Sequence, residues 1–101
     1  MRSFQCYQLA VQFYKLAKEA PLPSHLKNQF LRASSSITLN LAEGYGKSTM
    51  KDRRRVFQIA FGSIRECQSI IELEKNCFNF SEIDLLDYLA ASTYKLIRNS
   101  S

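Results

Sequence analysis

A cluster of basic residues carries the clearest chemistry in the sequence: Lys51, Arg53, Arg54 and Arg55. Thr49 and Asp52 are spaced like a helix cap, so the cluster falls at the start of a helix. Cations are disfavoured beside the positive end of a helix dipole, so their concentration there needs another reason. Phosphate contact is the natural one, because each neutralised phosphate adds to the affinity for nucleic acid. A solvated helix start is the alternative interpretation.

The segment before this cluster looks at first like the end of a phosphate-binding P-loop, with the residues Gly44-Tyr45-Gly46-Lys47-Ser48-Thr49. A P-loop also requires a glycine at position 41 and a preceding strand, whereas this chain has Leu41 within a helical pattern. We therefore interpret the segment as a turn between helices. Lys47 can still meet a phosphate at the start of the next helix.

A stripe of polar residues recurs at steps of three and four: Arg32, Ser36, Asn40, Glu43 and Lys47. This spacing places them on one face of a helix that borders the core. Further along, Ser63 and Glu66 lie beside Gly62, which would let a neighbouring helix approach closely. Buried polar groups need partners, so we expect a hydrogen-bonded cluster that holds the helices in register. Its expected members are Arg32, Ser36, Asn40, Glu43, Ser63 and Glu66, and a functional pocket is the alternative.

The residues that most enzymes and metal sites require are scarce. The chain has one histidine, His25, and no tryptophan, and its three cysteines form no C-x-x-C pair. Structural zinc sites usually draw on close ligand pairs, so neither a zinc site nor a disulfide framework is predicted. No nucleophile–base pair is visible either. We expect a non-enzymatic protein without a metal or another cofactor.

The net charge of +5 is unevenly distributed along the 101 residues. Residues 27–55 hold seven basic and two acidic residues, whereas residues 66–87 hold one basic and six acidic residues. Such asymmetry suits nucleic acid or a complementary surface on another copy of the chain.

Composition predicts one small domain, residues 1–101, with a few long helices. Apolar residues make up 46% of the chain, and only three glycines and two prolines are present. No apolar run is long enough to span a membrane, and no signal core follows the first residues. We expect a cytoplasmic protein without a membrane partner.

Apolar residues recur at helical spacing in four segments separated by short breaks. The segments span about residues 3–19, 24–44, 50–76 and 82–98. Short connections between helices favour antiparallel neighbours. The predicted fold class is all-α, as an antiparallel up-down-up-down four-helix bundle.

The helix ends also have local signals. Ser24, Thr49 and Ser81 are the N-cap residues that we expect for the last three helices. Gly44 and Gly46 should end the second helix, because glycine tolerates the left-handed conformation common just past a helix C-terminus.

Several helices are apolar on more than one face. A core of this size has little room for all four of the phenylalanines Phe13, Phe57, Phe61 and Phe80. Surplus apolar surface favours self-association into a cyclic homo-oligomer, and a somewhat apolar monomer is the alternative.

Two runs of the sequence carry a family resemblance. Residues 29–47, QFLRASSSITLNLAEGYGK, and residues 59–66, IAFGSIRE, resemble the motifs of four-helix bundle proteins encoded in intervening sequences of bacterial 23S ribosomal RNA genes. The resemblance covers nearly the whole chain. It implies an antiparallel bundle that assembles into a ring, usually a pentamer. It also implies related architecture in accessory proteins of diversity-generating retroelements, which are basic pentamers that partner a reverse transcriptase and bind nucleic acid.

The matching positions are Gln29, Arg32, Ser36, Asn40, Glu43, Gly44, Gly62, Ser63 and Glu66. The chain departs from the family pattern at Leu31 and Lys47, where the family usually has arginine. If those arginines touch RNA, binding by this chain is weakened or moves to residues 51–55.

The leading interpretation is a non-enzymatic, basic, oligomeric bundle that binds structured RNA or an RNA-handling partner such as a reverse transcriptase. The side chains expected to meet phosphate are Arg32, Lys47, Lys51, Arg53, Arg54 and Arg55. The alternative is a protein-interaction scaffold, in which the basic face of one subunit meets the acidic residues 66–87 of the next and serves ring assembly only.

Overall fold

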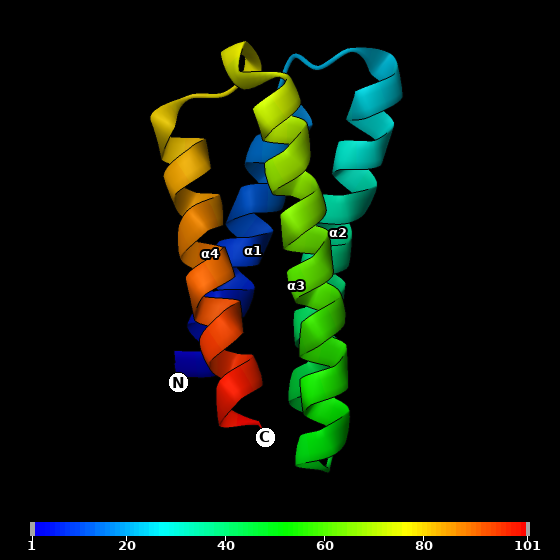
Figure 1. The fold of residues 1–101 in the computed structure, drawn as a ribbon, viewed down its shortest axis with the longest axis vertical. Coiled ribbons are helices and arrows are strands. Elements are labelled where there is room, and N and C mark those ends of the chain that lie inside the picture. Colours follow the sequence, from blue (N-terminus) through cyan, green and yellow to red (C-terminus); the bar gives the residue numbers. More distant parts are fainter. Residues whose placement is uncertain (1, 101) are drawn as a thin grey trace.

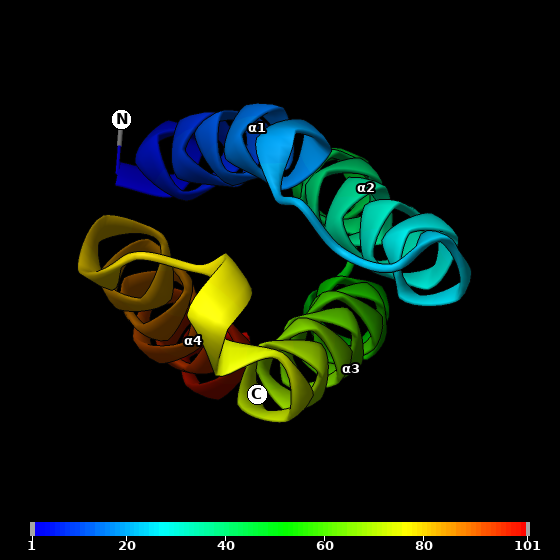
Figure 2. The same ribbon diagram turned by 90° about the horizontal axis from the view of Figure 1, so that it is seen from above.

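The computed structural model describes the backbone of residues 2–100 and the side chains of residues 5–100. Its elements are α1 (Arg2–Glu19), α2 (Ser24–Gly46), α3 (Met50–Leu73), a short 3₁₀ turn η1 (Lys75–Cys77) and α4 (Phe80–Asn99). The four helices alternate in direction (Figure 1). Seen from above, each packs beside the next along the chain, and α4 returns to lie beside α1 (Figure 2). The predicted all-α up-down-up-down bundle is confirmed.

The core is built from the apolar faces that the helical spacing predicts. Phe13 and Phe30 meet edge to face with ring centroids 5.8 Å apart, and Phe78 packs on Phe30 at 5.2 Å. Fully burying one such side chain stabilises the fold by about 1.5–3 kcal/mol. Phe61 is only half-buried, and Phe80 is 84% exposed. The bundle thus leaves part of the phenylalanine surface outside its core.

Two of the predicted N-cap residues are wrong. Asn79, not Ser81, caps α4. The Asn79 side chain accepts a hydrogen bond from the backbone N–H of Glu82, and the Glu82 carboxylate accepts one from the backbone N–H of Asn79. Ser24 is the first residue of α2 rather than its cap, and no side chain caps that helix. The expected cap of α3 is present, because Thr49 Oγ1 accepts from the Asp52 amide at 3.2 Å.

Glycine has a different role from the one expected. Gly44 and Gly46 both lie within α2, and no residue in the described part of the chain has a positive φ. A β-carbon at position 44 would overlap the ring of Phe57, so Gly44 allows α3 to come close to α2. A β-carbon at Gly62 would meet nothing within 4 Å, so the close neighbour expected there is absent from the part of the chain that the structure describes.

Lys27, a basic residue near the start of α2, binds the end of α1 and the loop that follows it. Lys27 Nζ donates to the backbone oxygen of Lys18 at 2.7 Å and to that of Ala20. These oxygens lie at the end of α1, where helix carbonyls lack intrahelical partners and a cation is favoured. Lys27 therefore holds the two helices together. Within residues 2–100, no helix is long and apolar enough to cross a membrane.

Candidate nucleic-acid interface

Three basic side chains come together where α3 begins and α4 ends. Lys51, Arg54 and Arg55 are spaced by three and four residues, so they share one face of α3. With neighbouring residues they line a cavity of about 480 Å³. We call it the basic groove, and its lining consists of Met50, Lys51, Asp52, Arg54, Arg55, Gln58 and Ser100. Figure 1 shows the end of α4 beside the first turns of α3.

The three cations of the basic groove are available to a ligand. Lys51, Arg54 and Arg55 are exposed, and no hydrogen bond or ion pair within residues 5–100 engages their side chains. Asp52 also lines the groove, but its carboxylate offsets only one of the three charges. The groove therefore has a net positive charge, which attracts anions and is screened by salt.

Arg53 points away from this groove, as its position on the helix predicts. Its Nε donates to the backbone oxygen of Lys47 at 2.8 Å, and both side chains are half-buried. This bond fastens the turn between α2 and α3 to the first turn of α3. Arg53 thus has a structural partner that the sequence did not indicate.

Arg32 lies on another part of the surface. It is 14 positions before Gly46, the last residue of α2, which is about 21 Å at 1.5 Å per residue. Its side chain is exposed, and no hydrogen bond or ion pair involving it is found in residues 5–100. The six predicted phosphate-binding residues therefore do not form one continuous surface, and the geometry groups three of them.

The predicted polar cluster is smaller than expected. Ser63 Oγ on α3 donates to Ser36 Oγ on α2 at 2.9 Å. Asn40 Nδ2 donates to the same Ser36 hydroxyl at 3.0 Å and to the Ser36 backbone oxygen at 2.8 Å. The three side chains are half-buried, so these bonds connect α2 to α3 at a position partly shielded from water.

The other expected members lie outside this cluster. Glu66 accepts a hydrogen bond from Gln29 Nε2 at 3.1 Å, which forms a second, exposed contact between α3 and α2. Glu43 and Arg32 join neither contact in the described part of the chain. Both side chains are exposed, so water solvates them and no protein partner is required.

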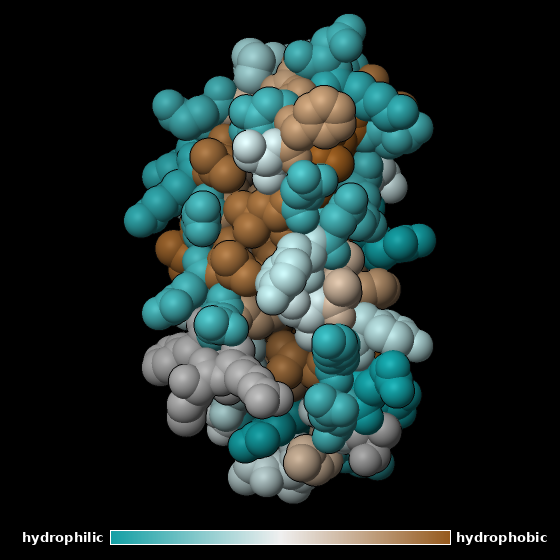
Figure 3. Space-filling view, turned by 90° about the vertical axis from the view of Figure 1, so that its left-hand side faces the viewer, coloured by the Kyte–Doolittle hydropathy of each residue, from teal (hydrophilic) through white to brown (hydrophobic). Residues whose placement is uncertain are grey.

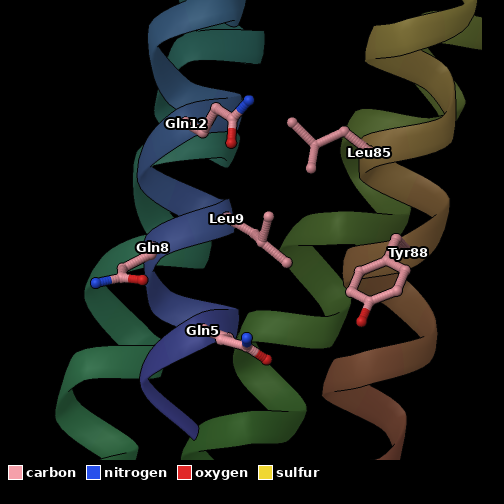
Figure 4. A pocket seen from close by; sticks show the side chains of 6 residues that line it. All are labelled: Gln5, Gln8, Leu9, Gln12, Leu85 and Tyr88. Carbon is pink, nitrogen blue, oxygen red and sulfur yellow. The ribbon is translucent and has the colours of Figure 1, made fainter. Parts of the chain in front are cut away.

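A further groove, which sequence reasoning missed, runs between α1 and α4. Its volume is about 490 Å³, and it is lined by Gln5, Gln8, Leu9, Gln12, Leu85 and Tyr88. Figure 4 shows Leu9 and Leu85 pointing toward each other across it. On this side of the molecule, apolar side chains form a strip with polar residues around it (Figure 3). The spacing of Leu9 indicated only a core position, so no signal marked a groove.

The buried titratable groups stay neutral. Burial raises the pKa of the Cys6 and Cys67 thiols and of the Tyr45 phenol above their usual values. Cys6 Sγ lies 3.6 Å from Thr93 Oγ1, between α1 and α4. A thiol held neutral is a poor nucleophile and a poor metal ligand. Among the described residues, no three His, Cys, Asp or Glu side chains gather closely enough to hold a metal ion.

A family model matches the chain over residues 4–98, and its description is 23S rRNA-intervening sequence protein. The chain belongs to this family. Searches of curated proteins and of solved structures found no match. The 23S rRNA-intervening sequence family model covers both motif runs, the polar cluster and the basic side chains of the groove. This match indicates that the chain is a small helical protein with an RNA-related role.

Proposed function

We propose that this 23S rRNA-intervening sequence protein is a non-enzymatic bundle that binds structured RNA through the basic groove. The observation that carries the proposal is the grouping of Lys51, Arg54 and Arg55 on one groove with no protein partner for their charges in residues 5–100. Phosphates supply the complementary charge, and their contacts release counterions, so binding depends on salt. Lys47 and Arg53 contribute by shaping the turn beside the groove. Arg32 is not needed for these contacts.

Fluorescence anisotropy with a labelled, folded fragment of large-subunit ribosomal RNA tests the proposal. The variant is the triple substitution K51A/R54A/R55A. The control is K15A/K75A/K95A, which removes the same charge from exposed positions elsewhere. We expect the first variant to bind more weakly and its salt slope to fall by about one unit per lost phosphate contact. The control should keep most of the slope.

Two results would contradict the proposal. One is no binding by the wild type even at low salt. The other is an equal loss of salt slope in both triple variants, which would mean that total charge and not the basic groove determines affinity. Circular dichroism melting of each variant confirms that the bundle is intact.

The proposal includes self-association, in a ring that the family resemblance predicts to be a pentamer. Leu39 and Ile59 are exposed, and each is three or four residues along its helix from the Ser36–Ser63 pair. Together with the open space at Gly62 they give the α2–α3 face an apolar area without a partner among the described residues. We expect L39E/I59E to lower the mass measured by light scattering. L73E, at another exposed leucine, should leave that mass unchanged.

A protein-interaction scaffold is the second candidate function. Exposed Glu72, Asp84 and Asp87 give the chain an acidic surface that complements the basic groove of another copy. In this case the ring dissociates at high salt, and the protein shows no affinity for RNA at any salt concentration. A ring that is stable in high salt and an RNA affinity that is lost there would exclude it.

A further inference from the structure

A second cavity adjoins the basic groove. Its volume is about 440 Å³, and its lining combines the end of α2, the start of α3 and the end of α4. Met50 and Ser100 line both cavities, so the two lie next to each other. We call it the aromatic pocket, and its lining consists of Tyr45, Met50, Arg53, Phe57, Leu96, Asn99 and Ser100.

The walls of the aromatic pocket suit a flat, partly apolar group. The rings of Tyr45 and Phe57 meet edge to face with centroids 5.3 Å apart, and Leu96 and Met50 add aliphatic and thioether surface. Arg53 and Asn99 bring hydrogen-bonding groups to the same cavity. The Arg53 guanidinium is already oriented by the Lys47 carbonyl, and its terminal nitrogens remain further donors. Apolar walls with a few placed polar groups are typical of small-ligand pockets of this size.

We propose that the aromatic pocket receives an unpaired base of the RNA whose phosphates lie in the basic groove. The inference rests on the proposed function and specifies its ligand. Phosphate and base are separated by one sugar, so a single nucleotide can reach both adjoining cavities. A base inside a duplex cannot enter, because it is stacked and paired. RNA recognition through bases commonly uses loops, bulges and ends, whose bases can leave the helix.

The test compares two probe hairpins that are identical except at one bulged nucleotide. In one hairpin that nucleotide is an adenosine, and in the other it is abasic. Both present the same backbone charge to the basic groove. We expect wild-type protein to bind the hairpin with the base roughly tenfold more tightly, as a single stacked base contributes in other RNA-binding sites.

Variants connect this preference to the aromatic pocket. Met50 and Asn99 are exposed, so M50A and N99A should leave the bundle folded. We expect each to reduce the preference for the hairpin with the base. Of the two cavities, Asn99 lines only the aromatic pocket, so N99A should also leave the affinity for the abasic hairpin the same. L73A and N28A are the matched controls at exposed positions elsewhere, and they should keep the full preference.

The outcomes separate this inference from the proposed function. Equal affinity of the wild type for the two hairpins would overturn the base pocket while leaving phosphate binding in place. Unchanged preference in both M50A and N99A would also overturn it. Absence of binding to both hairpins and to the ribosomal RNA fragment would overturn the proposed function itself. K51A/R54A/R55A should weaken binding of both hairpins to the same extent.

Discussion

The ring of Phe57 on α3 occupies the space into which a β-carbon at Gly44 on α2 would project. Such a β-carbon would lie 2.7 Å from Phe57 Cδ1, which is closer than real carbon atoms approach. Phe57 is buried, and its ring also packs against Tyr45. Glycine at position 44 thus allows α2 and α3 to meet closely beside the aromatic pocket.

This contact predicts opposite effects of alanine at two helical glycines. G44A should lower the free energy of unfolding by about 1–3 kcal/mol, because the Phe57 ring must shift in a packed core. G62A should raise it by roughly 0.5–1 kcal/mol, because the added methyl group meets nothing and alanine favours the helix. Urea unfolding measures both. A G44A variant as stable as the wild type would refute the close approach.

The serine pair between α2 and α3 predicts energetic coupling. The Ser63 hydroxyl donates to the Ser36 hydroxyl, so a double-mutant cycle of S36A and S63A should give a coupling energy of about 0.5–1.5 kcal/mol. S69A is the control on α3, since Ser69 bonds only to the backbone of its own helix. Cycled with S36A, it should show no coupling. Additive effects of S36A and S63A would contradict the role of this pair in helix register.

The four helices could be predicted because the spacing of the apolar residues in each segment indicates which face of that helix is buried. Ile37 and Leu41, for example, are fully buried as their spacing predicts. The grouping of Lys51 with Arg54 and Arg55 could be predicted for the same reason, since it depends on one helix alone.

Contacts between distant segments could not be predicted in this way. The bond from Arg53 to the Lys47 carbonyl depends on the path of a turn, and no residue type in the turn indicates it. The aromatic pocket brings together Tyr45, Phe57 and Leu96 from three helices. Their spacing along the chain has no period, so only the packed bundle shows that they share a cavity. The cap at Asn79 was missed because Ser81 and Asp84 offer the same spacing.

We expect Lys27 to be important for the stability of the bundle and not for RNA binding. K27M should lower the free energy of unfolding by about 1 kcal/mol, because the carbonyls at the end of α1 lose a charged donor. K15M, at an exposed position on α1, should change stability little. Both variants should bind the ribosomal RNA fragment with similar affinity. A stronger loss of RNA binding in K27M than in K51M would contradict this assignment.

We expect Cys77 to react faster with a thiol reagent than the other two cysteines. Cys77 is half-buried, whereas Cys6 and Cys67 are fully buried. Burial also raises the pKa of Cys6 and Cys67, which lowers the fraction of the reactive thiolate. Near neutral pH the folded protein should therefore label quickly at one thiol, and at three after denaturation. C77S should abolish the fast phase, and fast labelling of C77S would contradict the buried positions.

The raised pKa of Cys67 also predicts that the stability of the fold falls at alkaline pH. Burial disfavours the thiolate in the folded state, so the unfolded chain releases its proton near the ordinary value of 9.0 while the folded chain retains it. The unfolded state then binds fewer protons, and the free energy of unfolding falls as the pH rises above 9.0. Urea midpoints between neutral and alkaline pH measure this fall. It should be shallower in C67A, and an equally steep fall in that variant would show that other groups cause it.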